Sequence, residues 1–211
     1  MERFFRPDRL WGEGPYPHFL ILLNEHPAYR AYAEAHHGLL SAYPLGVVPA
    51  QWLHGTILGI HHRVSPVQLE LLCRAARTEL STVAPCEVQL GPVWPGVTAI
   101  TAAVYPEDGL AALNARARVA AESVPGITLR PPEPFWGHST LAYALDDFDD
   151  RRLNRELRAL RPDRVTLTVD RIALVNEYQD PVAGHYTWDV VEEFRLGTDS
   201  TSRGCTTAAR R

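Results

Sequence analysis

The sequence predicts one domain of mixed strands and helices, built as two related lobes around a shared groove. Two observations lead to this prediction. Runs typical of strands alternate with helical patterns along the chain, and the string His-x-Thr occurs twice, each time in an apolar run typical of a strand. The copies are Trp-Leu-His-Gly-Thr at 52–56 and Trp-Gly-His-Ser-Thr at 136–140. Side chains two residues apart share a face of a strand, so each strand presents its histidine and threonine together.

The elements of the first half follow from local signals. Residues 1–17 are rich in Pro, Gly, Arg and aromatic residues, which predicts an irregular N-terminal arm that could cover one end of the groove. Pro27 is typical of a first helical turn, and Ser65 followed by Pro66 is typical of a helix start. We expect strands over 18–23 and 51–60 and helices over 27–41 and 66–80.

Glycine and proline turns separate the elements of the second half. The stretch at 131–137 predicts a stiff loop that leads into the second motif strand. The tail at 197–211 has little apolar content, which predicts disorder, so the single bilobal domain is expected over 18–196. We expect strands over 86–90, 97–104, 138–145, 164–178 (with a kink) and 185–194, and helices over 106–123 and from Asp149 or Asp150 to about 160.

Composition limits the class of partner. The 211 residues carry a formal net charge of −4, which disfavours binding to duplex DNA or long RNA because such binding relies on many Lys or Arg contacts with phosphate. The three cysteines match no metal or disulfide spacing, and no set of residues has the spacing of metal ligands. No apolar run is long enough for a signal peptide or a membrane span. We expect a cytoplasmic monomer without membrane contact, metal or cofactor.

Two imidazoles and two hydroxyls suit acid–base chemistry on a phosphodiester. Histidine titrates near neutral pH, so one of His54 and His138 can accept a proton while the other donates one. The hydroxyls of Thr56 and Thr140 can donate hydrogen bonds to phosphate oxygens where charge develops. A single His-x-Thr string is common in strands, but two matched copies point to one joint site.

The segments Leu53-His54-Gly55-Thr56-Ile57-Leu58 and Gly137-His138-Ser139-Thr140-Leu141-Ala142-Tyr143 resemble the paired signatures of the 2H phosphoesterase superfamily, which includes the 2′-5′ RNA ligases and RNA cyclic phosphodiesterases. The resemblance covers roughly residues 15–196. It implies a bilobal α+β fold, with two antiparallel sheets flanking a central groove and helices outside. It also implies metal-independent cleavage of 2′,3′-cyclic phosphates or 2′–5′ linkages by His54, Thr56, His138 and Thr140. In this family the second histidine commonly activates the nucleophile and the first protonates the leaving oxygen.

Further residues are candidates for substrate contact. Phe135 and Trp136 lie on the loop before the second motif, where one of them could stack on a base. Tyr143 stands where RNA-acting relatives often have an arginine, and Tyr186 could point into the groove from the last strand pair. Arg130 could contact phosphate, although solvent exposure without a role is an equally plain explanation.

The sequence therefore predicts a phosphodiesterase that opens 2′,3′-cyclic phosphates on small nucleotides or short RNA ends. One alternative is a phosphodiesterase or ligase for 2′–5′ oligonucleotides or small cyclic nucleotides. Another is a nucleotide-binding module without catalysis, which would need no pair of proton-transfer groups.

Overall fold

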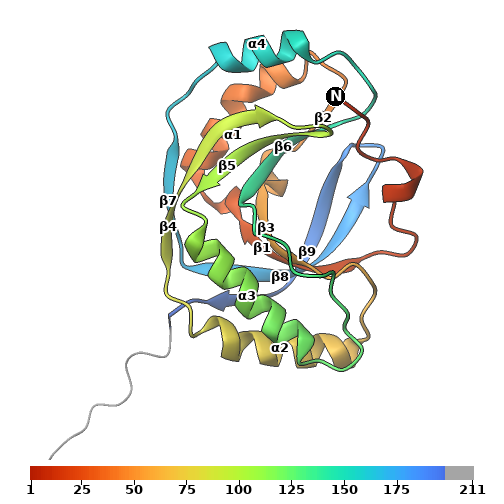
Figure 1. The fold of residues 1–211 in the computed structure, drawn as a ribbon, viewed down its shortest axis with the longest axis vertical. Coiled ribbons are helices and arrows are strands. Elements are labelled where there is room, and N and C mark those ends of the chain that lie inside the picture. Colours follow the sequence, from red (N-terminus) through yellow and green to blue (C-terminus); the bar gives the residue numbers. More distant parts are fainter. Residues whose placement is uncertain (198–211) are drawn as a thin grey trace, which may run out of the picture.

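A computed structural model describes residues 1–197, which form a strongly curled antiparallel sheet with helices on its outside (Figure 1). The strand order is β7-β4-β5-β6-β3-β1-β8-β9, and β2 pairs with β6. The strands are β1 (Tyr16–Leu22), β2 (Leu45–Val47), β3 (His54–Gly59), β4 (Cys86–Pro95), β5 (Ala99–Tyr105), β6 (His138–Ala144), β7 (Val165–Val169), β8 (Arg171–Asp180) and β9 (His185–Arg195). The α-helices are α1 (Pro27–Leu40), α2 (Pro66–Leu80), α3 (Asp108–Glu122) and α4 (Arg151–Ala159).

The α+β fold with antiparallel pairing is confirmed, and the two expected sheets are the two halves of one sheet. One half contains β3, β1, β8 and β9, and the other contains β6, β5, β4 and β7. The halves meet where the two motif strands pair, with Gly55 opposite Ser139. The sequence pattern does not show this link because a short contact between two lobes leaves no periodic signal.

Two of the helices pack on the half of the sheet opposite to the strand that precedes them in the chain. Helix α1 follows β1 in the chain but contacts β7 of the other half, while α3 follows β5 and contacts β3. Helices α2 and α3 pack together on one half, and α4 lies on the other (Figure 1). Each half of the sheet therefore has its apolar outer face covered by a helix that the other half supplies. The core packs between these helices and the sheet, and the concave face remains open.

The expected kinked strand at 164–178 is two separate strands. Asp170 lies between β7 and β8; β7 pairs with β4, whereas β8 pairs with β1 in the other half of the sheet. The chain thus crosses between the two halves at this residue. The local pattern is apolar on both sides of Asp170, so it predicts strands but not the change of partner.

Other boundaries differ by a few residues. The first motif strand begins at His54, because residues 50–52 form a short 3₁₀ turn, and β4 continues through Pro95 rather than ending near residue 90. Strand β2 forms where a plain connection was expected. The predicted tail lies, from residue 198 on, outside the described residues. Within residues 1–197, no helix is both long and apolar enough to cross a bilayer.

The N-terminal arm connects both halves of the sheet at one end of the groove. The amide of Phe4 donates to the carbonyl of Ala144 at the end of β6, and Phe5 is buried in the core. Further along, the amide of Trp11 donates to the side chain of Gln179 in β8 at 2.7 Å. Figure 1 shows the arm in red passing beside β8 and β9.

Candidate active site

The two motifs lie side by side at the centre of the sheet. Because β3 and β6 are antiparallel and Gly55 faces Ser139, the register sets His54 beside Thr140 and Thr56 beside His138. A Cβ on Gly55 would lie 3.4 Å from the carbonyl oxygen of His138, so glycine gives the strands room to approach. Each histidine is therefore next to the threonine of the other motif.

Alternation along the strands fixes which side chains reach the groove. On β3, His54 and Thr56 line the groove, while Ile57, and Leu53 just before the strand, are buried on the opposite face. On β6, His138 and Thr140 line the groove, and Leu141 is buried on the opposite face. Burial of these apolar residues, at about 1.5–3 kcal/mol each, holds both strands in the register that the chemistry needs.

Both histidines are held by the backbone of their own segment. Nδ1 of His54 lies 2.8 Å from the carbonyl oxygen of Trp52, and Nδ1 of His138 lies 3.1 Å from the carbonyl oxygen of Trp136. A carbonyl oxygen can only accept, so Nδ1 carries the hydrogen in both rings. In the neutral form, Nε2 of each ring is then left with a free lone pair for proton transfer.

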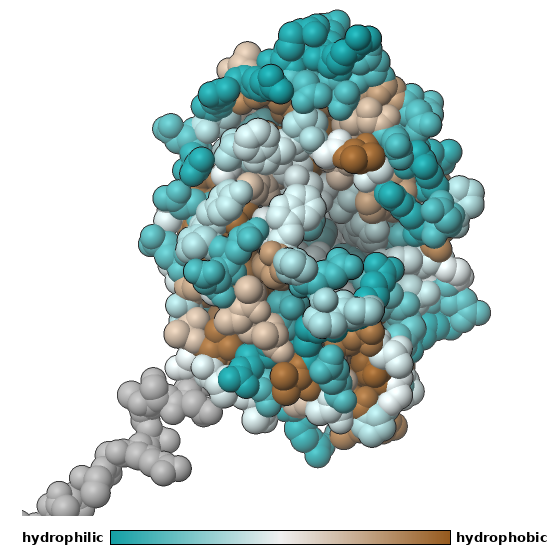
Figure 2. Space-filling model, in the orientation of Figure 1, coloured by the Kyte–Doolittle hydropathy of each residue, from teal (hydrophilic) through white to brown (hydrophobic). Residues whose placement is uncertain are grey.

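The groove has a volume of about 770 Å³, which is in the usual range of small-molecule sites. Figure 2 shows the hollow on the face where the motif strands meet, bordered mainly by polar and weakly polar residues. It is lined by the four motif residues and by aromatic, histidine, arginine and glutamate side chains from the arm, β1, β6, β8, β9 and the loops, among them Arg9, Trp11, His18, His61, Arg130, Trp136, Tyr143, Glu177 and Tyr186.

Four of the five predicted contact residues lie in the groove. Trp136, Tyr143, Tyr186 and Arg130 line it, whereas Phe135 does not; its partly buried ring packs against the hydrophobic core instead. Of the two aromatic residues on the loop, Trp136 therefore reaches the groove and Phe135 does not. Direction along an irregular loop has no fixed period, so the sequence could not distinguish the two.

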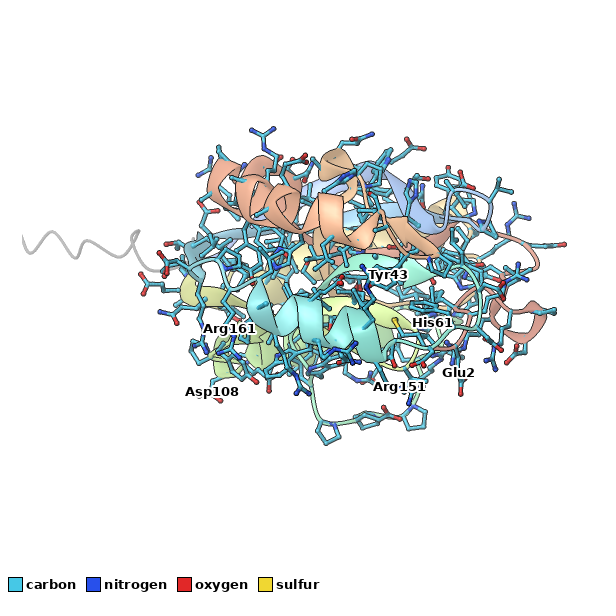
Figure 3. The ribbon with its side chains drawn as sticks, turned by 90° about the horizontal axis from the view of Figure 1, so that it is seen from above. Glu2, Tyr43, His61, Asp108, Arg151 and Arg161 are labelled. Carbon is cyan, nitrogen blue, oxygen red and sulfur yellow. The ribbon has the colours of Figure 1, made fainter. Side chains whose placement is uncertain are left out.

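His61 adds a further imidazole at the side of the groove. It follows β3 directly, and its ring centroid lies 5.4 Å from that of His18. In Figure 3, His61 and Glu2 of the arm lie toward one side of the molecule, and Asp108 and Arg161 lie toward the other. Burial, together with the nearby charge of Arg130, lowers the pKa of His61 to about 4.

His54 lies in a buried environment. Its side chain is 7% exposed, and the edge of its ring meets Trp188 with the ring centroids 4.9 Å apart. Burial lowers the pKa of its imidazole. The carboxyl oxygen Oε1 of Glu177 lies 3.6 Å from its Nε2.

Sequence reasoning missed Glu177 and His18, which lie beside His54. Glu177 is 3% exposed on β8, and its Oε2 lies 3.3 Å from Nε2 of His18 on β1. Burial raises the pKa of Glu177 to about 8 and lowers that of His18. One signal was present: Glu177 is a carboxylate within an apolar strand, and charged groups are rarely buried without a partner.

His138 has different neighbours. The indole of Trp136 stacks on its ring, with centroids 4.0 Å apart, and 59% of Trp136 is exposed. Burial lowers the pKa of His138 too. Within residues 1–197, no carboxylate forms an ion-pair contact with His138, whereas Glu177 lies against His54.

Comparison with known proteins places the fold. No protein-family model matches the sequence, and no curated protein matches it. Among solved structures, TT0787 of Thermus thermophilus superposes with a TM-score of 0.68 at 21% identity, covering 88% of this chain and 100% of that one. LigT of E. coli in complex with 3′-AMP superposes with a TM-score of 0.64 at 18% identity, covering 87% and 99%. A third structure, described as a phosphoesterase, has a TM-score of 0.61 at 17% identity, covering 86% and 98%. The chain therefore has the same fold as these structures.

Proposed function

We propose that this chain is a monomeric phosphodiesterase that opens 2′,3′-cyclic phosphates on nucleotides or short RNA ends, without a metal. One observation carries the proposal. His54 and His138 each bond Nδ1 to a backbone carbonyl, which leaves Nε2 of each available in the same groove. Two imidazoles held in this way suit a reaction in which one proton is removed and another is delivered.

The chemistry follows from the protonation of the two rings. A neutral imidazole accepts a proton from the attacking water, and the other ring protonates the ribose oxygen that leaves phosphorus. Thr56 and Thr140 supply hydroxyl donors for the non-bridging oxygens, where charge develops in the transition state. Each proton transfer is typically worth about 10²–10⁴ in rate.

The groove favours a small nucleotide as substrate. Trp136 offers an exposed indole for stacking, Tyr143 and Tyr186 offer further aromatic surface, and Arg130 offers a positive charge for phosphate. E. coli LigT, which shares the fold, has been crystallised with 3′-AMP and with ATP, and this supports a nucleotide ligand here. The formal charge of −4 disfavours a long nucleic acid.

The test is hydrolysis of 2′,3′-cyclic nucleotides by the full chain in the presence of a chelator, with products separated by chromatography. We expect His54→Ala and His138→Ala each to lower kcat by roughly 10²–10⁴-fold. His37→Ala is the matched control, since His37 is exposed on α1 and outside the groove.

Turnover that survives in both motif variants would contradict the proposal. Tight binding of the cyclic nucleotide without product would show a binding module instead. A panel with 2′–5′ dinucleotides and 3′,5′-cyclic nucleotides ranks the substrates by kcat/KM.

A further inference from the structure

A buried group of three side chains lies against the first motif. Glu177 of β8 lies between His18 of β1 and His54 of β3, with its two carboxyl oxygens 3.3 Å and 3.6 Å from the respective Nε2 atoms. All three side chains are nearly inaccessible, and all three form part of the groove wall. The group is therefore sealed by the fold on one side and open to a ligand on the other.

Hydrogen-bond chemistry requires a proton within this group. In His18, Nδ1 lies 3.1 Å from the carbonyl oxygen of Tyr16, the same arrangement as in His54. Both Nδ1 atoms therefore carry hydrogen, and both Nε2 atoms present lone pairs toward Glu177. A carboxylate facing two lone pairs would be repelled by both, so the group keeps one proton shared among the carboxyl and the two Nε2 atoms.

Packing holds His18 in place. Trp11 of the arm stacks on its ring at a centroid distance of 5.4 Å, and a Cβ on Gly59 would lie only 2.6 Å from its Nε2. The absence of a side chain at Gly59 thus makes room for the imidazole to reach Glu177. The arm, β1 and β3 together fix the position of this ring.

We propose that Glu177, held by His18, is the positioning residue that supplies the proton that His54 delivers to the leaving oxygen. This inference rests on the proposed function. It extends the proposed function by adding two residues outside the motifs, Glu177 and His18, to the path of the proton.

The proton movements balance over one turnover. Nε2 of His138 takes a proton from water as the oxygen–phosphorus bond forms. Glu177 passes its proton to Nε2 of the neutral His54. The bond from phosphorus to the ribose oxygen then breaks as the same Nε2 gives that proton to the leaving oxygen. After the phosphomonoester leaves, His138 releases its proton to solvent and Glu177 regains one through the groove.

Burial supports this assignment. It favours the uncharged form of all three groups, so the resting state has Glu177 as a carboxylic acid beside two neutral imidazoles. An uncharged Glu177 does not repel an incoming phosphate. The negative phosphate then stabilises a positive charge on His54 and draws the proton from Glu177 to that ring.

The first experiment compares two leaving groups in the Glu177→Gln variant of the full chain. Glutamine keeps the size of the side chain but has no proton to give up. For a 2′,3′-cyclic nucleotide, whose ribose oxygen must be protonated, we expect kcat to fall roughly 10²-fold or more. For bis(4-nitrophenyl) phosphate, whose nitrophenolate leaves unprotonated, we expect a change of less than about threefold on the same reasoning.

A matched control and a second measurement keep the inference testable. Glu193→Gln makes the same change on β9, outside the groove, and both rates should be unchanged. Nitrogen-15 NMR of histidine-labelled protein reads protonation without any substrate. In the natural sequence His54 and His18 should titrate as one coupled group, and Glu177→Gln should separate them.

Two results would overturn the inference. One is an equal fall of both rates in Glu177→Gln, which is the outcome of a purely structural role. The other is an unchanged titration of His54 in that variant. If instead neither the natural protein nor its variants hydrolyse a cyclic phosphate, the proposed function fails. The NMR titration then still decides whether Glu177, His18 and His54 share a proton.

Discussion

The two motif strands are alike in sequence and unlike in their surroundings. Both present a histidine with Nδ1 bonded to a backbone carbonyl and a threonine two residues later. His54 is buried against Trp188 and Glu177, whereas His138 lies under the exposed indole of Trp136 with no carboxylate in contact among the described residues. A matched pair of motifs can thus place two similar groups in one groove while their neighbours give the two groups different environments.

The largest expected effect is on the pH profile of kcat/KM. His138 must be neutral to act as a base, so activity should rise with pH through its pKa, which burial places below the usual 6.5. Glu177 must keep its proton, so activity should fall above about pH 8, by about tenfold per pH unit. The titratable groups around Glu177 are His18, His54, Tyr143 and Tyr186.

Steady-state rates measured across roughly pH 4 to 10 check both limbs of this bell-shaped profile. Glu177→Gln should remove the falling limb and keep the rising one. A falling limb that persists in this variant would mean that another group supplies the proton.

A smaller effect is expected when the space for His18 is filled. In Gly59→Ala the new methyl group would lie 2.6 Å from Nε2 of His18 and 3.0 Å from a ring carbon of His61, so the His18 ring must move away from Glu177. We expect kcat to fall about tenfold, because the ring that holds Glu177 is displaced. Gly38→Ala is the control, since a Cβ there has nothing within 4 Å. Equal kinetics in the two variants would remove His18 from the account.

The smallest effect is expected at the second motif, beside His138. Trp136→Ala removes an indole that covers His138 and is open to a base, and stacking of this kind contributes about 1–3 kcal/mol. We expect KM to rise roughly fivefold or more, with a smaller change in kcat. Trp94→Ala removes a similarly exposed indole outside the groove and should change neither constant. A large fall in kcat alone would instead give Trp136 a role in the chemistry.

The sequence predicted the parts of the site that depend on local pattern. Alternation along two strands placed His54 with Thr56 and His138 with Thr140, and the structure has all four in one groove. The period of a strand does not reveal its partner, so β7 and β8 were expected as one strand and the contact of Glu177 with His54 was not expected. Phe135 shows the same limit, since a loop without regular period does not fix where a ring points.

The division of labour between the two histidines is tested most directly by measuring His54→Ala and His138→Ala on two substrates. One is a 2′,3′-cyclic nucleotide, and the other is bis(4-nitrophenyl) phosphate, whose leaving group needs no acid. We expect both variants to lose the first activity, and we expect His54→Ala to retain most of the second while His138→Ala loses it. Equal losses of the second activity in both variants would contradict that division of labour.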